Sequence, residues 1–274
     1  MLRSVRLDGT DARVVVDAES LVTSVVPAAG LEAGSHEGAA LSASWLTAHA
    51  EHAHDPSAYS SLADATDADG AQRMTLTLDM CQSSRAWEKR FYDELSSLSA
   101  QLGAPLPVGI AMTGGWARAH GTELADLRRR NGDTLAIEWV NHSNKHPLHC
   151  TDASMRTCRF LTDPSVSMPD EVLGLEQVLL SQGEVPGALF RFPGLVHDTR
   201  RLNELNDLGL FALDADAWLA KGQAPHPGAV ILLHGNGNEV PGIQKATTWL
   251  RAHKAEILAG KIRLVAPRAV VARR

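Results

Sequence analysis

The sequence lacks several features that would assign it at once to a class of protein. Its 274 residues include three cysteines, too few for a disulfide scaffold, although three allow one bridge and one free thiol. Its 26 Lys and Arg residues are outnumbered by 32 Asp and Glu residues, and the net charge of −6 argues against nucleic acid as a partner. No apolar run approaches the roughly 20 residues that a membrane span requires, so we expect none.

Residues 1–26 also lack the basic start and continuous apolar stretch of a signal peptide, and the sequence leaves both localisation and oligomeric state open. An apolar fraction of 44% is enough to build a substantial core. The first part of the chain differs in composition from the rest, because residues 34–70 are mainly Ala, Ser, His, Asp and Gly with little hydrophobic periodicity. We therefore expect an irregular N-terminal extension or small subdomain over residues 1–72 and a second unit over residues 73–274.

After Arg73, short apolar runs alternate with amphipathic stretches, which is typical of βα units around a parallel sheet. The expected strands are Met74–Leu78, Val108–Met112, Thr134–Val140, Ala188–Phe192, Leu210–Leu213, Ala229–Leu233 and Ile262–Val265. The expected helices are Trp87–Leu102 closed by Gly103, Glu123–Arg130, Ser167–Gly183, Thr199–Leu208 and Gly242–Leu258. This pattern favours an α/β fold, a distorted (β/α) barrel of about seven parallel strands, while a doubly wound open sheet would give the same local signals.

Polar side chains lie at the carboxyl ends of five of these strands. They are Asp79, His142 with His146 four residues later, Arg191, Asp214 and His234. If the strands are neighbours in one sheet, these groups share one rim, where parallel α/β folds place their chemistry. Taken singly, an Asp after a strand is usually a turn former or a helix cap, and two His at a spacing of four arise easily by chance. We interpret Arg191 and Asp214 as an ion pair that settles a buried charge.

The same residues lie in motifs that resemble those of the polysaccharide deacetylase family, whose catalytic unit is the NodB homology domain of carbohydrate esterase family 4. Residues 77–81 (Thr-Leu-Asp-Met-Cys) resemble its Thr-Phe-Asp-Asp-Gly motif, and residues 142–146 match His-Ser/Thr-x-x-His. Residues 191–194 approximate Arg-x-Pro-x-Gly, with the glycine one place early. Asp214 followed by Trp218, and Leu232–His234, match two further motifs. The resemblance covers about Arg73 to Pro267.

The resemblance implies a metal-dependent hydrolase that removes an acetyl group from an N-acetylated (or O-acetylated) sugar or another small amide. Imidazole and carboxylate ligands would hold a divalent ion, commonly zinc, that polarises the acetyl carbonyl and activates water. Transferred residue by residue, the resemblance implies that His142, His146 and a carboxylate such as Asp79 are metal ligands. It implies Asp79 as general base and His234 as general acid, with Arg191 and Asp214 orienting and tuning Asp79. Trp218, Pro193 and Gly194 would line the substrate pocket.

One departure from the family pattern concerns the metal. Met80 stands where the family has a carboxylate ligand, and hard divalent ions tolerate a thioether poorly. Three outcomes stay open: Asp79 ligates the ion and another group acts as base, Cys81 supplies a thiolate, or the ion binds weakly or not at all. A Cys81–Cys150 disulfide would be a competing use of that sulfur. Two alternative functions also stay open, a hydrolase of another non-peptide C–N bond and a catalytically silent carbohydrate-binding homologue.

Overall fold

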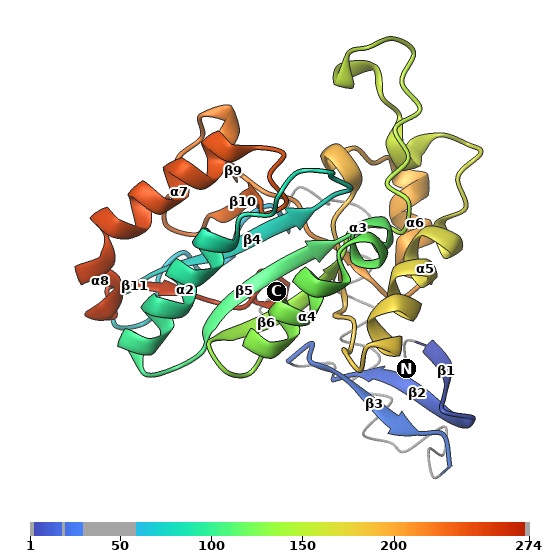
Figure 1. Cartoon of the computed structure of the whole chain (residues 1–274), viewed down its shortest axis with the longest axis horizontal. Coiled ribbons are helices and arrows are strands. Elements are labelled where there is room, and N and C mark those ends of the chain that lie inside the picture. The colour runs from blue at the N-terminus through green and yellow to red at the C-terminus, as the bar shows by residue number, and fades with distance from the viewer. Residues whose placement is uncertain (1–2, 18–19, 30–58, 272–274) are drawn as a thin grey trace.

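The main sheet is a curled half-barrel in the computed structural model, which describes residues 3–17, 20–29 and 59–271 (Figure 1). Its seven strands are β4 (Gln72–Met80), β5 (Leu106–Met112), β6 (Leu135–Asn141), β7 (Leu189–Phe190), β8 (Phe211–Ala212), β9 (Ala217–Trp218) and β10 (Val230–His234). All pairs are parallel and the order is β8-β7-β6-β5-β4-β10-β9. This order is cyclic in the sequence, as in a barrel, but no ladder joins β8 to β9 among the described residues. The predicted distorted (β/α) barrel is confirmed, and β11 (Ile262–Leu264) adds to it by pairing with the start of β4.

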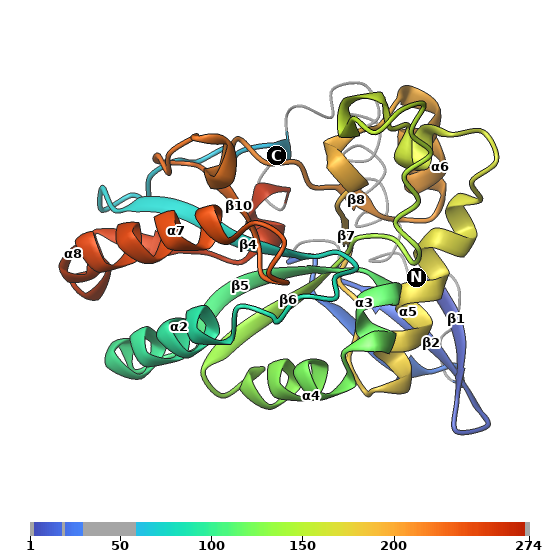
Figure 2. The ribbon, with the colours of Figure 1, turned by 45° about the horizontal axis from the view of Figure 1, so that its top comes forward.

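Helices cover the outer face of this sheet (Figure 2). They are α2 (Lys89–Leu102), α3 (Gly114–Ala119), α4 (Gly121–Arg130), α5 (Met168–Ser181), α6 (Thr199–Asp207), α7 (Val240–Ala252) and α8 (Lys254–Leu258). As predicted, Gly103 closes α2 in the left-handed conformation and the Ser167 hydroxyl caps α5. The single helix predicted over Gly242–Leu258 is instead two, because the backbone turns at His253. In the described ranges, no helix has both the length and the apolar character needed to cross a membrane.

The alternation of side chains along each strand sorts residues between two faces. On β4, Leu76, Leu78 and Met80 join the core between the sheet and the helices. The intervening Thr77 and Asp79 face the inside of the curl. Both accept hydrogen bonds there from the guanidinium of Arg191, which directly follows β7. A residue two positions beyond an inner one therefore also faces inward, and this rule places the polar groups described below.

An antiparallel sheet precedes the half-barrel and consists of β1 (Arg3–Leu7), β2 (Thr10–Val16) and β3 (Thr23–Pro27), drawn in blue beside α5 in Figure 1. The Arg3 guanidinium forms a largely buried ion pair with Glu176 of α5 at 3.0 Å, which fastens the sheet to the half-barrel. Most of the loop predicted over residues 34–70 lies outside the described residues. The division of the chain at residue 72 stays a prediction.

Candidate active site

Inward-facing side chains at the carboxyl ends of β4, β6 and β10 form one cluster. Asp79 Oδ2 lies 3.7 Å from His142 Nε2, and Cys81 Sγ lies 3.4 Å from the same nitrogen. The His146 ring packs edge-on against the His142 ring, with centroids 5.0 Å apart. His234 is the register partner of Asp79 in the β4–β10 ladder. Residues far apart in the sequence therefore meet at one rim of the half-barrel, with Asp79 and His142 buried and His146 and His234 partly exposed.

A backbone contact fixes the orientation of the His142 ring directly after β6. Its Nδ1 lies 2.8 Å from the carbonyl oxygen of Arg191. A carbonyl can only accept, so Nδ1 carries the proton and Nε2 faces Asp79 and Cys81. Burial works to lower the pKa of His142, but the negative charges of Asp79 and Cys81 outweigh it, and the pKa lies above its usual value. A proton and a metal ion would compete for the same Nε2 lone pair.

The loop that carries His146 is tightly wound. Ser143 and His146 adopt positive φ angles of 71° and 48°, which are uncommon for residues other than glycine. The backbone N–H of His146 donates to the Ser143 hydroxyl at 3.1 Å, and Glu171 of α5 accepts from the two backbone N–H groups between them at 3.0 and 2.7 Å. Because α5 holds this uncommon backbone, the two imidazoles converge on one point.

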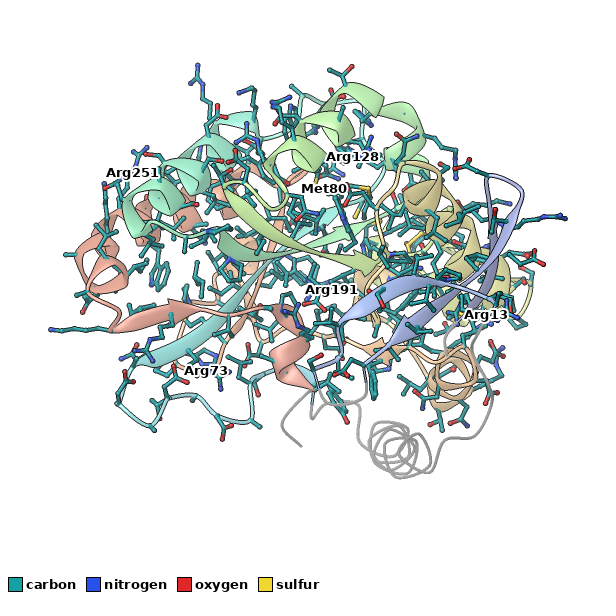
Figure 3. The ribbon with its side chains drawn as sticks, turned by 90° about the horizontal axis from the view of Figure 1, so that it is seen from below. Arg13, Arg73, Met80, Arg128, Arg191 and Arg251 are labelled. Carbon is teal, nitrogen blue, oxygen red and sulfur yellow. A yellow bond between two sulfur atoms is a disulfide. The ribbon has the colours of Figure 1, made fainter. Side chains whose placement is uncertain are left out.

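A buried arginine holds the Asp79 carboxylate. The Arg191 guanidinium, labelled near the middle of the view in Figure 3, is fully buried. It donates to Asp79 Oδ1 at 2.9 Å and to the Thr77 hydroxyl at 2.6 Å. Burial alone would raise the pKa of Asp79, but Arg191 and then His142 outweigh it, so this pKa lies below its ordinary value. Asp79 is therefore an ionised carboxylate whose second oxygen faces the imidazole cluster.

The expected ion pair between Arg191 and the carboxylate of Asp214 is wrong. Arg191 donates to the main-chain oxygen of Asp214 at 3.2 Å, whereas the Asp214 carboxylate lies 3.0 Å from His197 Nε2. The buried charge of Arg191 is compensated by the similarly buried Asp79, and the somewhat more exposed Asp214 contacts the partly exposed imidazole of His197. Asp214 thus supports Arg191 through its backbone.

His234 has a carboxylate partner that no motif predicted. Its Nδ1 lies 2.8 Å from Glu239 Oε2, and the Trp218 indole N–H donates to the same oxygen at 2.8 Å. The Trp218 and His234 rings lie 5.8 Å apart. Burial works to lower the pKa of His234, but Cys81 and Glu239 raise it to about 10. Glu239 lies in the irregular loop after β10, where no periodicity marks it.

Met80 and Cys81 point in opposite directions. Met80 is fully buried on the helix side of β4, and its sulfur accepts a hydrogen bond from the Tyr92 hydroxyl at 3.2 Å. Cys81 follows Asp79 by two residues and so returns to the inner face, where period-two alternation could have placed it in advance. Burial raises the pKa of Cys81, but His142 above all outweighs burial, and the pKa lies well below its usual value.

The disulfide between Cys81 and Cys150, which the sequence left open as an alternative, does not form. Cys150 bonds instead to Cys158, eight residues further along the same loop, and Cys81 is a free thiol. Closing a short loop costs less chain entropy than joining residues 81 and 150. The sulfur of Cys81 is therefore available to the imidazole cluster.

Pro193 and Gly194 shape the wall next to His146. Pro193 is buried and opens a short 3₁₀ turn in which Gly194 has a φ of 65°. A Cβ at Gly194 would lie 2.7 Å from the Phe160 ring, and that ring packs edge-on against His146 with centroids 5.8 Å apart. The close approach therefore requires glycine, and the substrate-pocket role of Pro193 and Gly194 stays a prediction.

Three side chains of this cluster fit a transition-metal ion. Within the described ranges, the one group of three His, Cys or acidic residues that could hold a metal is Cys81, His142 and His146, whose ligand atoms all lie within 4.8 Å of one another. Imidazole nitrogen and thiolate sulfur are ligands that zinc prefers. The Asp79 carboxylate is not part of this group, and one of its oxygens accepts a hydrogen bond from Arg191.

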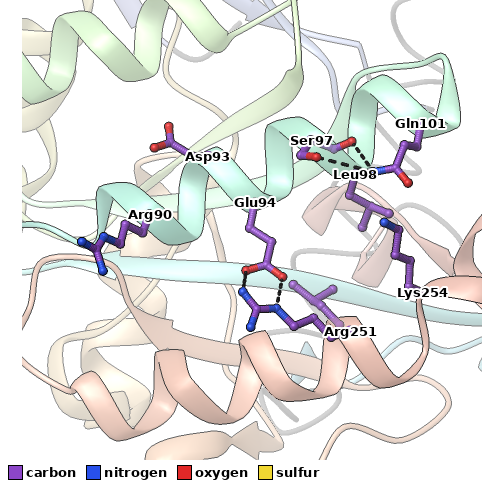
Figure 4. Close-up of a pocket in the computed structure, with 9 residues that line it drawn as sticks. Arg90, Asp93, Glu94, Ser97, Leu98, Gln101, Arg251 and Lys254 are labelled. Carbon is purple, nitrogen blue, oxygen red and sulfur yellow. Dashed lines mark hydrogen bonds and ion pairs between the residues drawn. The ribbon is translucent and has the colours of Figure 1, made fainter.

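A surface groove of about 470 Å³ lies elsewhere, between α2 and α7 (Figure 4). An ion pair between Glu94 and Arg251 at 2.7 Å crosses it, and Arg90 and Lys254 also line it. None of the cluster residues lines this groove. The cluster at the strand ends therefore remains the candidate for chemistry.

No family model matches the sequence. Among solved structures, the Bc1960 peptidoglycan N-acetylglucosamine deacetylase is similar at 14% identity and a TM-score of 0.53, over 76% of this chain and 89% of that one. A family 4 carbohydrate esterase from Bacillus anthracis is similar at 16% identity and a TM-score of 0.54, over 75% and 84% of the two chains. The peptidoglycan deacetylase PdaC from Bacillus subtilis is similar at 16% identity and a TM-score of 0.51, over 72% and 88%. The half-barrel of this chain is therefore the fold of carbohydrate esterase family 4, the NodB-like deacetylase fold.

Proposed function

We propose that this protein is a metal-dependent, deacetylase-like hydrolase that cleaves a non-peptide C–N bond by removing the acetyl group of an N-acetylated sugar or oligosaccharide, with O-acetyl groups as a second substrate type. The observation that carries the proposal is the ionised Asp79, held by buried Arg191 with one oxygen turned toward the imidazole of His142. The similar solved structures include deacetylases of peptidoglycan, which supports an acetylated sugar as the substrate class.

His142 and His146 would hold a divalent ion together with one further group from the end of β4, and their nitrogen donors suit zinc. When bound, such an ion supplies a Lewis acid for the acetyl carbonyl and lowers the pKa of water. The imidazole of His142 is already aimed by its hydrogen bond to the Arg191 carbonyl, so little reorganisation accompanies binding.

Asp79 acts as the general base in this proposal. It takes the proton of the attacking water, and Arg191 keeps it deprotonated beforehand at neutral pH. His234 acts as the general acid and returns a proton to the leaving nitrogen. Glu239, at 2.8 Å, holds its ring and stabilises the imidazolium, while the Trp218 ring beside it forms a wall for the acetyl group.

The test is acetate release from N-acetylglucosamine oligomers by the metal-loaded protein. Asp79→Asn keeps the size of the side chain and removes the base, so turnover is expected to fall more than about a hundredfold. Asp207→Asn, at an exposed carboxylate on α6, is the matched control and should leave the rate unchanged. Full activity of Asp79→Asn would refute the assignment of the base.

One observation favours a second candidate function. Met80 is turned into the core where the family has a carboxylate ligand, which is what a catalytically silent carbohydrate-binding homologue would retain after losing its metal. Such a protein would bind chitin oligomers without releasing acetate at any zinc concentration. Acetate release from a different small amide, with none from sugar oligomers, would instead indicate cleavage of another C–N bond.

A further inference from the structure

We propose that Cys81 supplies a thiolate as the third protein ligand of the metal, in place of the carboxylate that Met80 has displaced. The inference rests on the proposed function for the presence of an ion at this site. It assigns an N₂S donor set of His142, His146 and Cys81, and it leaves Asp79 free to act as base.

The distances within the cluster match such a site. Cys81 Sγ lies 3.4 Å from His142 Nε2. In tetrahedral coordination with a Zn–S bond of about 2.3 Å and a Zn–N bond of about 2.0–2.1 Å, these two ligand atoms would be about 3.6 Å apart. The atoms of Cys81, His142 and His146 all lie within 4.8 Å of one another, so one ion can contact all three after small side-chain rotations.

The other two side chains at the end of β4 fit the ligand position less well than Cys81 does. Met80 faces the helices, and its sulfur is hydrogen-bonded to the Tyr92 hydroxyl. Asp79 gives one oxygen to Arg191, and its carboxylate does not join the group of convergent ligand atoms. Cys81 is therefore the anionic donor at the end of β4 that reaches both imidazoles.

Hydrogen bonds hold the backbone of Cys81 in place. The buried Asn236 amide donates to the Cys81 carbonyl at 2.7 Å, and the Thr113 hydroxyl donates to the carbonyl of Met80 at 2.9 Å. Side chains from the loops after β10 and β5 thus hold the peptide groups that precede and follow Cys81. A preorganised donor costs less entropy to order when an ion binds.

The donor chemistry predicts which ions bind. A thiolate with two imidazoles suits Zn²⁺ and Co²⁺, whereas Mg²⁺ and Ca²⁺ prefer oxygen ligands. A family site with a carboxylate at this position would discriminate less against oxygen-seeking ions. Cys81 is also the one free thiol of the chain, because Cys150 and Cys158 are bonded to each other. A signal from a metal-bound thiolate therefore reports Cys81 alone.

The experiment titrates Co²⁺ into the metal-free full chain and follows absorption. Wild type is expected to bind one equivalent with a thiolate-to-cobalt charge-transfer band in the near ultraviolet. Cys81→Ser is expected to lose the band and to bind on the order of a hundredfold more weakly. Cys81→Asp restores a carboxylate and should recover part of the affinity without the band. Bound Zn²⁺ should also protect the Cys81 thiol of the native wild type from alkylation, a measurement that needs no variant.

The outcomes separate this inference from the proposed function. Cobalt binding by wild type without the band, or equal affinity in Cys81→Ser, would overturn the thiolate ligand and leave the hydrolase proposal in place. A band with one equivalent of metal but no acetate release from sugar oligomers would support the ligand and count against the hydrolase. Failure of wild type to bind Co²⁺ or Zn²⁺ would overturn the inference, and acetate release in the same samples then decides the hydrolase separately.

Discussion

Glu138 is a buried carboxylate on β6, and replacing it gives a prediction about the free energy of unfolding. It is 7% exposed on the inner side of β6, and Oε2 accepts from the backbone N–H of Arg268 at 3.0 Å and from its guanidinium at 3.4 Å. Burial raises the pKa of Glu138 from 4.5 to about 7, even though Arg268 opposes the rise. The folded protein thus binds this proton more tightly than the unfolded chain does.

The sign and size of the effect follow from proton linkage. Between pH 4.5 and 7, Glu138 binds more protons in the folded state than in the unfolded state. Its contribution to the free energy of unfolding therefore falls as the pH rises. Each pKa unit corresponds to about 1.4 kcal/mol, which makes ionised Glu138 cost about 3 kcal/mol above pH 8. Glu138→Gln keeps the acceptor for the Arg268 backbone N–H and removes that cost. Its stabilisation relative to wild type should grow by about 2–3 kcal/mol between pH 5 and pH 8.5.

The assay is urea unfolding of wild type and Glu138→Gln at both pH values. Other titrating groups are common to the two proteins and cancel in the difference. Glu256→Gln, at an exposed carboxylate on α8, is the control and should show a difference near zero at both. A pH-independent difference, or a variant that is less stable at pH 8.5, would refute the reasoning from burial.

Three further perturbations act on other parts of the structure. Met80→Asp would bury an unpaired carboxylate beside Tyr92, so urea unfolding should show a loss of about 3 kcal/mol or more, and a gain in zinc affinity would contradict the placement of Met80 in the core. Gly194→Ala forces a Cβ into the Phe160 ring at a positive φ, so stability should fall by about 2 kcal/mol, and an unchanged unfolding midpoint would count against this packing. Cys150→Ser opens a short loop, which should cost about 2.5 kcal/mol under oxidising conditions, whereas equal midpoints would show that the bridge does not form.

Most of the half-barrel was predictable because apolar runs mark buried parallel strands. All seven predicted strands coincide with strands of the structure, from β4 to β8 and at β10 and β11. The prediction omitted β9, since two residues such as Ala217 and Trp218 form no run. It also omitted α3, which begins with two glycines that argue locally for a turn.

The cluster at the strand ends was predictable as a set, whereas the choice of partners within it was not. Period-two alternation aligns Asp79 with Cys81, but it does not say whether Arg191 pairs with one carboxylate or another. The choice depends on which carboxylate is buried together with Arg191, and this is known only in the folded state. Likewise, sequence leaves the pairing of three cysteines open, and the loop that brings Cys150 to Cys158 has no periodic signal.

The strict two-face character of β4 limits how this chain can vary in length. Deleting or duplicating a single residue before Asp79 would shift the frame of the strand by one place and rotate every later side chain through half a turn. The apolar side chains of β4 would then face the inside of the half-barrel, and Asp79 and Cys81 would be forced against α2. Changes in length inside β4 must therefore come in pairs of residues, so that the polar and the apolar side chains keep their separate faces.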